Sequence, residues 1–264
     1  MSKRADSVET GSAVAAADLC VFTLRLADDA LILGQRLSEW CSNAPFLEEE
    51  LALANTALDF LGRARFLYAR AGVLEGEGRS EDDFAYGRGP ESFTNLLICE
   101  LPRGDFAFTM ARQFLFDSFD VLYLRALGAS ADKALAGIAA KALKEADYHQ
   151  RRSRTWMLRL GQGTRESRRR AQRALDALAP YSGEMFEMNA LETRLRSAEI
   201  APDRAALKTP WQLALSETLQ EAALSWPQSS EQISGGREGQ HTPHLETLLD
   251  EMQALTREMP GLSW

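Results

Sequence analysis

The chain has 264 residues, of which 45% are hydrophobic and 26% are charged, and its formal net charge is −8. This composition suits one large or two small globular domains with an ample core, and the negative charge argues against nucleic acid as a partner. No apolar run reaches the roughly 18 residues of a membrane span. The N-terminus lacks the apolar core of a signal peptide, and Cys20, Cys41 and Cys99 have no CxxC spacing. We therefore expect reduced thiols in a cytoplasmic protein that contacts no membrane.

The N-terminal third predicts a polar extension and two long helices. We expect residues 1–13 to be disordered and residues 14–264 to form a single domain. In the first helix, at about 14–40, apolar residues recur in steps of three and four, as in helical bundles. The second helix, at about 45–71, has apolar residues on more than one side, so we expect it to be buried on several sides. We assign the stripe that contains Leu47, Leu51 and Leu58 to the core.

The rest of the chain continues as helix. A glycine-rich loop at 76–90 precedes a short helix at 91–100. Helices follow at about 106–127 and 131–161, where Asp105 and Asp132 stand at the N-cap positions. Shorter helices are expected at 167–178, 182–197, 210–225 and 244–259, with a loop at 226–243, and no strand pattern appears. The long connection between the second and third long helices predicts an all-α, ferritin-like antiparallel four-helix bundle with additional C-terminal helices. We expect one core to bury a set of residues from all four long helices: Leu26, Leu33, Leu51, Leu58, Phe114, Val121, Ile138 and Trp156.

Acidic residues inside these helices raise the question of a di-metal site. Such a site takes one carboxylate from each of two helices and a Glu-x-x-His pair from each of the other two. Acids are present in all four helices, but histidines are missing at the required step of three residues. Gly62 follows Asp59 at that step and Tyr148 follows Glu145, while His149 is rotated by about 100° around the helix. The candidate cluster comprises Glu39, Asp59, Asp117, Glu145 and His149.

Without histidine ligands this cluster is a poor site for iron. We favour a metal-free polar cluster over an ion held by the acids alone, and both over a working redox centre. We therefore assign no catalytic, cofactor-binding or metal-ligating residue. His149 is also explained as a hydrogen-bonded core histidine, and Asp59 as a partner of Arg63 one turn on. Asp117 lies in an apolar stripe, so it needs a partner, because an unpaired buried aspartate costs several kcal/mol.

Arginines are concentrated in and after the fourth long helix. They form either a solvated face or a docking surface for an acidic partner or a phosphorylated ligand. The zone contains Arg151, Arg152, Arg154, Arg159, Arg165, Arg168, Arg169, Arg170 and Arg173.

Several stretches resemble one known family. They are TLRLADDALILGQRLSEWCSNAP, LALANTALDFLGRAR and KEADYH, followed by SGGREGQHTPHLETLLDEMQ and MPGLSW near the C-terminus. These stretches are similar to the PaaC family, the C subunits of the bacterial phenylacetyl-CoA monooxygenase (epoxidase). The resemblance extends from about Asp18 to the end of the chain.

The resemblance implies a ferritin-like structural subunit without a working di-iron centre of its own. In that family the di-iron site belongs to the catalytic A subunit, which also binds the acyl-CoA, and a reductase supplies electrons from NADPH. The reaction inserts one oxygen atom of O2 into the aromatic ring. We expect a homodimer when the chain is alone, and an interface with another subunit around Leu53, Ala57 and Phe60. The alternative function is a self-sufficient di-metal carboxylate oxidase, oxygenase or metal store.

Overall fold

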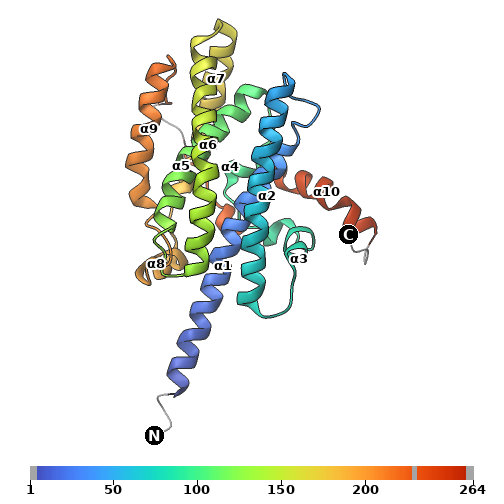
Figure 1. Ribbon diagram of the computed structural model, residues 1–264, viewed down its shortest axis with the longest axis vertical. Coiled ribbons are helices and arrows are strands. Elements are labelled where there is room, and N and C mark those ends of the chain that lie inside the picture. Colours follow the sequence, from blue (N-terminus) through green and yellow to red (C-terminus); the bar gives the residue numbers. More distant parts are fainter. Residues whose placement is uncertain (1–4, 228–230, 260–264) are drawn as a thin grey trace.

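The computed structural model describes residues 5–227 and 231–259, in which helices alternate with loops (Figure 1). No strand occurs among these residues, so the all-α prediction is confirmed. The α-helices are α1 (Ala5–Ser38), α2 (Leu47–Glu75), α3 (Glu81–Tyr86), α4 (Leu97–Glu100), α5 (Phe106–Leu127), α6 (Lys133–Gln162), α7 (Arg165–Leu178), α8 (Ala190–Ser197), α9 (Lys208–Glu221) and α10 (Pro243–Glu258).

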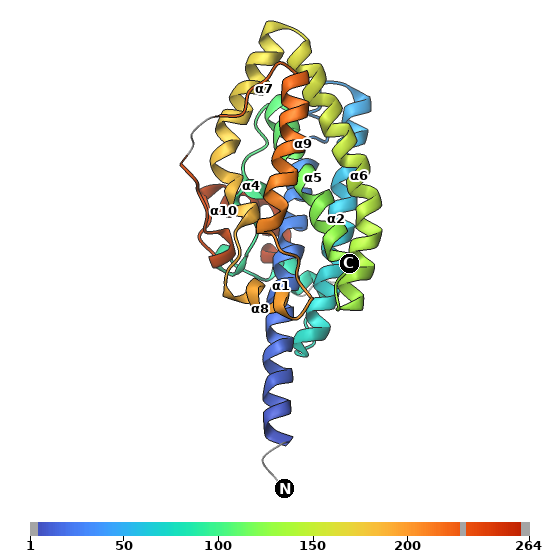
Figure 2. The same cartoon turned by 90° about the vertical axis from the view of Figure 1, so that its left-hand side faces the viewer.

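The four long helices form two antiparallel pairs, α1 with α2 and α5 with α6 (Figures 1 and 2). The connection from α2 to α5 is long and contains α3 and α4, which is the single crossover of a ferritin-like bundle. Helix α9 packs against α5 and α6, whereas α10 packs against α3 and α4. The C-terminal helices therefore cover the bundle from different sides, and the segment between them crosses the structure.

Local sequence signals account for several helix ends. The side chains of Asp105 and Asp132 accept hydrogen bonds from the backbone N–H groups of Phe108 and Leu135, each at 2.9 Å. These bonds satisfy donors that have no partner within a helical first turn. Helix α2 ends at Gly76, which adopts the left-handed conformation with φ 76°. Glycine takes up this conformation without the steric cost that other residues incur.

Three predicted boundaries differ from the structure. The loop expected at 76–90 contains α3, which Ser80 and Asp83 stabilise with a capping box. The helix expected at 91–100 consists of a 3₁₀ turn and the single turn of α4. Helix α1 begins at Ala5, inside the segment expected to be disordered, while residues 1–4 lie outside the described part of the chain. The final MPGLSW motif lies outside it from residue 260 onward.

The predicted core is correct for three of the four long helices. Leu33 and Phe114 are fully buried. Leu26, Val121, Ile138 and Trp156 are partly buried and pack against the same core. The assignment of Leu51 and Leu58 to this core is wrong, because their side chains are 56% and 64% exposed.

The opposite side of α2 faces the core instead. Leu53, Ala57 and Phe60 are buried inside this chain, so the interface expected there is wrong. Helix α2 has two apolar stripes. The buried one runs from Leu53 through Leu67 to Ala71. The other stripe faces outward and is named here the exposed α2 stripe: Leu47, Leu51, Leu58, Phe66 and Val73.

Candidate functional site

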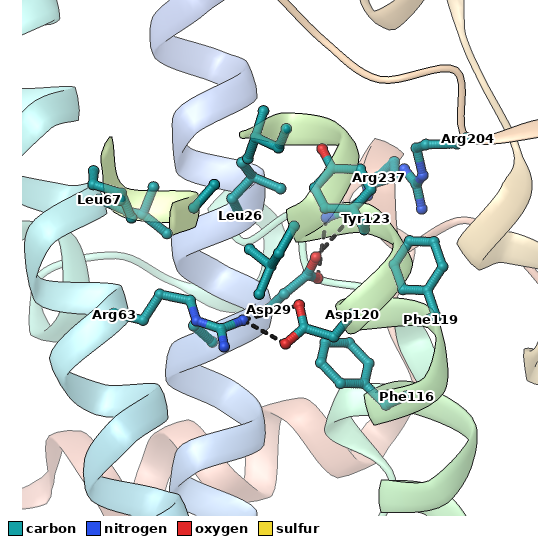
Figure 3. A pocket seen from close by; sticks show the side chains of 15 residues that line it. Leu26, Asp29, Arg63, Leu67, Phe116, Phe119, Asp120, Tyr123, Arg204 and Arg237 are labelled. Atoms are coloured by element: carbon teal, nitrogen blue, oxygen red, sulfur yellow. Dashed lines mark hydrogen bonds and ion pairs between the residues drawn. The ribbon is translucent and has the colours of Figure 1, made fainter. Parts of the chain in front are cut away.

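A layer of buried ion pairs crosses the bundle interior (Figure 3). Nη1 of Arg63 on α2 donates to both carboxylate oxygens of Asp120 on α5, at 2.9 and 2.7 Å. Arg237 forms a fork with Asp29 on α1, with distances of 3.1 Å from Nη1 to Oδ1 and 2.7 Å from Nη2 to Oδ2. All four charged groups are buried, and each of the two carboxylates pairs with its own guanidinium.

Arg237 reaches this layer from the loop between α9 and α10. It lies in a 3₁₀ turn, Gly236–Glu238, and Nη1 also donates to the backbone oxygen of Thr94 at 2.7 Å. A side chain at Gly236 is excluded, because a Cβ atom there would lie 2.1 Å from the Asn95 carbonyl oxygen. Burial alone would lower the pKa of Arg237, but the Asp29 carboxylate raises it above its ordinary value. The guanidinium is therefore a permanent cation beside α1.

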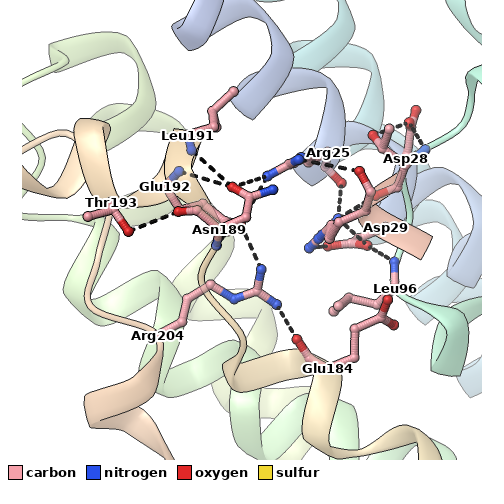
Figure 4. A network of polar contacts seen from close by, with 12 residues as sticks. Arg25, Asp28, Asp29, Leu96, Glu184, Asn189, Leu191, Glu192, Thr193 and Arg204 are labelled. Atoms are coloured by element: carbon pink, nitrogen blue, oxygen red, sulfur yellow. Dashed lines mark hydrogen bonds and ion pairs between the residues drawn. The ribbon is translucent and has the colours of Figure 1, made fainter. Parts of the chain in front are cut away.

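A second polar network continues from this layer toward α8 (Figure 4). Nη1 of Arg204 donates to Oε1 of Glu192 at 2.9 Å, and Nη1 of Arg25 lies 3.4 Å from the same oxygen. Arg204 also donates to the backbone oxygen of Glu184 at 3.1 Å. These contacts connect α1 to the C-terminal half of the chain, so arginine–carboxylate pairs stabilise the tertiary arrangement of the whole interior.

Between the two ion pairs lies an internal cavity of about 30 Å³. Its lining combines the four charged groups with the aromatic rings of Phe116, Phe119 and Tyr123. A volume of this size holds about one water molecule. The interior therefore has no room for an organic substrate beside the ion pairs.

The predicted cluster residue His149 contacts Asp59 across the gap between α6 and α2. Nε2 of His149 and Oδ2 of Asp59 are 3.0 Å apart, and the imidazole ring packs against Phe60 with 5.3 Å between ring centroids. Burial lowers the pKa of His149 below its ordinary value, although the Asp59 carboxylate opposes this. His149 is thus a hydrogen-bonded core histidine, and the alternative pairing of Asp59 with Arg63 is wrong because Arg63 binds Asp120.

The other predicted acids lie apart from one another. Asp117 is buried and accepts a hydrogen bond from Nε2 of Gln113 at 3.3 Å. Burial raises the pKa of Asp117 to about 8, so this carboxyl group is largely neutral at pH 7. Burial, and then the nearby Asp59, also raise the pKa of Glu145. Glu39 follows the end of α1 and pairs with Arg36 at 2.6 Å, so it does not join the cluster.

The two positions that lack histidine are open to the surface. Tyr148 is half exposed, and a Cβ atom at Gly62 would meet no atom of a neighbouring element within 4 Å. The described residues contain no group of three or more His, Cys, Asp or Glu side chains that could hold a metal ion. The carboxylates best placed in the interior, Asp29 and Asp120, use both oxygens for arginine. Two guanidinium cations would also repel a metal cation, so these residues do not fit a di-iron centre.

The arginine-rich zone is divided between internal pairs and solvent. Arg152 pairs with Glu49 on α2, whose Oε2 also accepts from Nε1 of Trp156 at 3.0 Å. Arg154 pairs with Glu221 on α9 at 2.7 Å. Within α7, Arg169 and Arg170 pair with Glu166. Much of the zone therefore joins α6 to its neighbours.

Sequence reasoning missed Asp29, and it considered Arg63 only as a partner of Asp59. Asp29 does carry a signal, because the pair Asp28–Asp29 interrupts an apolar stretch of α1. Arg237 carries no such signal, because it lies in a polar, glycine-rich stretch, and such a stretch predicts a solvent-exposed loop. Only the tertiary structure brings this loop to α1.

The fold and the interior together define the class: an all-α, ferritin-like bundle whose central carboxylates are neutralised by arginine. The chain belongs to the family described as phenylacetic acid catabolic protein, whose sequence model matches residues 3–264. It is 44% identical over 246 residues to the C subunit of the 1,2-phenylacetyl-CoA epoxidase of Escherichia coli (strain K12). That match covers 93% of this chain and 99% of the relative, which confirms the resemblance predicted from the motifs.

Proposed function

We propose that this chain is a non-catalytic structural subunit of a multicomponent di-iron oxygenase, one that epoxidises the ring of phenylacetyl-CoA in aerobic phenylacetate degradation. The extent of the match to the C subunit of an epoxidase supports this role. The observation that carries the non-catalytic part is the pairing of Asp29 with Arg237 and of Asp120 with Arg63. Both interior carboxylates are thereby committed to permanent cations and are unavailable as iron ligands.

The catalytic chemistry then belongs to another subunit of the complex. By resemblance this is the A subunit, which carries the di-iron site, and a reductase supplies its electrons. The present chain supplies a rigid helical surface against which that subunit is held. We place the complex in the cytoplasm, with residues 14–264 as a single domain. None of the described helices combines the length and apolar character that crossing a bilayer requires.

The exposed α2 stripe is the surface that we assign to the contact between subunits. Leu47, Leu58 and Val73 are each more than half exposed, and about 39 Å of helix separates the first from the last at 1.5 Å per residue. Large exposed apolar side chains that recur along one side of a helix over this length suit a protein interface. The stripe contacts the catalytic subunit in the complex, and a second copy of this chain when the chain is alone.

Metal content and turnover test the proposed function. Protein expressed alone in iron-rich medium should lack stoichiometric iron, and should not oxidise phenylacetyl-CoA even with the reductase. Addition of the catalytic subunit should give a complex with activity. About two irons per isolated chain together with turnover would instead establish the self-sufficient di-metal enzyme.

The interface assignment has a separate test. Leu58→Asp should weaken assembly in sedimentation velocity while circular dichroism stays unchanged, because the side chain is largely exposed. An equally exposed position outside the stripe provides the control, Leu213→Asp on α9. Equal effects of the two substitutions would place the contact elsewhere.

A further inference from the structure

A groove of about 440 Å³ lies between α2 and α6, beside the exposed α2 stripe. The two helices run antiparallel and side by side (Figures 1 and 2). Asp59 and His149 connect them at one end of the groove, and Arg70 and Asp132, whose side chains are 2.8 Å apart, connect them at the other end. Between these contacts the helices leave a trench with apolar walls, lined by Leu58, Phe66, Ala134, Ile138 and Ala142.

Two glycines line the groove, Gly62 on α2 and Gly137 on α6. A Cβ atom at Gly62 or Gly137 would meet no heavy atom of a neighbouring element within 4 Å. Neither glycine has a positive φ, so the backbone does not require glycine at either position. Glycine inside a helix costs about 0.5–1 kcal/mol relative to alanine. The fold of this chain thus gains nothing from the two glycines, whereas a backbone that approaches from outside would need the space.

The floor of the groove has unused hydrogen-bonding capacity. Arg63 lines the groove and is more than nine-tenths buried. Its Nη1 binds Asp120, but its Nε and Nη2 have no hydrogen-bond partner among the described residues. Buried donors without partners are rare, because each costs about 1–3 kcal/mol. Arg63 lines the internal cavity as well as the groove, so either a water molecule in that cavity or an acceptor brought into the groove would satisfy them.

Charge is distributed unequally along the groove. Lys133 lies at one end, and Lys141 lies about two turns further along α6, with its ammonium 4.4 Å from the centroid of the Phe66 ring. In the part of the chain that the structure describes, no carboxylate lies within ion-pair distance of either lysine. The other end has the carboxylates of Asp59 and Glu145. The groove is therefore dipolar, and a purely anionic ligand would meet like charge at the acidic end.

We propose that this groove receives one helix of another subunit of the complex, which has acidic side chains over Lys133 and Lys141, a basic side chain over Glu145, and small residues between them. The proposal rests on the proposed function. From Lys133 to Glu145 the groove follows about 18 Å of α6, a length that matches three turns of a docked helix. Leu58 and Phe66 belong both to the groove and to the exposed α2 stripe, so one partner would cover the two surfaces together. Small residues are what permit such close approach of helices.

Filling the groove tests the proposal. Gly137→Leu places a side chain in the trench, and its Cβ atom meets no heavy atom of a neighbouring element within 4 Å. The matched control is Ala140→Leu, at an exposed position on the same helix that does not line the groove. The affinity of each purified variant for the catalytic subunit is measured by sedimentation velocity, and the melting temperature of each isolated variant is recorded. We expect Gly137→Leu to raise the Kd at least tenfold and Ala140→Leu to leave it unchanged, with neither variant melting below the wild type.

Charge reversal tests the dipole independently. Lys141→Glu and Glu145→Lys should each weaken association more at low salt than at high salt, since exposed charges are screened. If Gly137→Leu binds the partner as tightly as the wild type, the groove is not the docking site and the proposal is overturned. If the wild-type chain itself does not associate with the catalytic subunit, it is the proposed function that fails. Binding of the small apolar anion 8-anilinonaphthalene-1-sulfonate gives a further outcome. If Gly137→Leu abolishes binding of this dye while association with the catalytic subunit stays intact, the groove belongs to a small ligand instead.

Discussion

Arg63 and Asp120 form a buried ion pair between α2 and α5, in which one guanidinium nitrogen lies 2.9 and 2.7 Å from the two carboxylate oxygens. Metal-binding bundles of ferritin-like fold direct interior carboxylates at a bound cation. Here the cation is part of the chain, so the layer is complete without an added ion. The arrangement connects the two halves of the bundle through charge rather than through metal ligation.

Removal of the cation alone should destabilise the protein strongly. Arg63→Met leaves the Asp120 carboxylate buried without its partner, and we expect the free energy of unfolding to fall by about 3–5 kcal/mol. The double variant Arg63→Met/Asp120→Leu removes both charges and should recover most of this loss. Urea denaturation of the wild type and both variants measures the effect. A single variant as stable as the wild type would mean that the pair does not hold the helices together.

The two sides of α2 should differ sharply in their contribution to stability. Phe60→Ala removes a fully buried ring and leaves a cavity, so we expect a loss of about 3–5 kcal/mol. Leu58→Ala acts at a side chain that is 64% exposed, and its effect should stay within about 0.5 kcal/mol. Chemical denaturation of the isolated chain gives both values. A larger loss for Leu58→Ala than for Phe60→Ala would mean that the side of α2 with Leu58 faces the core, as the sequence predicts.

The α2 error shows what periodicity can and cannot determine. Helical spacing located the long helices and the caps at Asp105 and Asp132, because these signals are local. It could not rank two apolar stripes on one helix by spacing alone. Both stripes extend over most of the helix, so their length does not distinguish the buried one either. The role of Arg237 depends on a contact between segments far apart in the sequence, which no local pattern records.

The sequence predicts the acidic cluster only in part, because helical spacing is again a local signal. Asp59 and His149 come together as their helical positions suggest, because neighbouring helices in a bundle juxtapose facing residues. Glu39 was assigned to α1 on residue type, but it lies past the last turn of that helix. Asp29, three turns earlier, is the acid that α1 contributes to the interior. The position of an acid along the helix therefore says more than its residue type about whether it reaches the interior of the bundle.

Asp117 should make the stability depend on pH. Burial raises its pKa from 3.8 to about 8, so between these values the folded protein binds a proton that the unfolded chain releases. The contribution of Asp117 to stability therefore falls as pH rises from about 4 to 8. Asp117→Asn keeps the acceptor for Gln113 but cannot ionise, so it should be more stable than the wild type at pH 8 by more than about 1 kcal/mol. At pH 4 the two proteins should unfold at nearly the same urea concentration, and a constant difference across this range would contradict the assignment.

The segment that carries Arg237 into the bundle should also respond to pH, in a different range. His241 follows on this segment, and its two ring nitrogens face only acceptors: Nδ1 lies 2.7 Å from Oε2 of Glu100, and Nε2 lies 2.8 Å from the carbonyl oxygen of Phe93. Oε1 of Glu100 accepts from the backbone N–H of Thr242 at 2.6 Å. Both nitrogens can donate only in the imidazolium form.

Burial alone would lower the pKa of His241, but the Glu100 carboxylate, the Phe93 carbonyl and the more distant Asp28 raise it above the ordinary value. The stabilisation from this pair is therefore fully present below about pH 6.5 and is lost as pH rises through the raised pKa. Backbone amides of residues 236–244 should then exchange with deuterium faster, after correction for intrinsic rates, at pH 9 than at pH 6. Exchange in α5 reports the pH dependence that comes from Asp117. His241→Gln should abolish the additional pH dependence of the segment, since the amide does not titrate, and should leave exchange in α5 as in the wild type. Equal protection of the segment at the two pH values would show that His241 is neutral in the folded protein, with one nitrogen left unpaired.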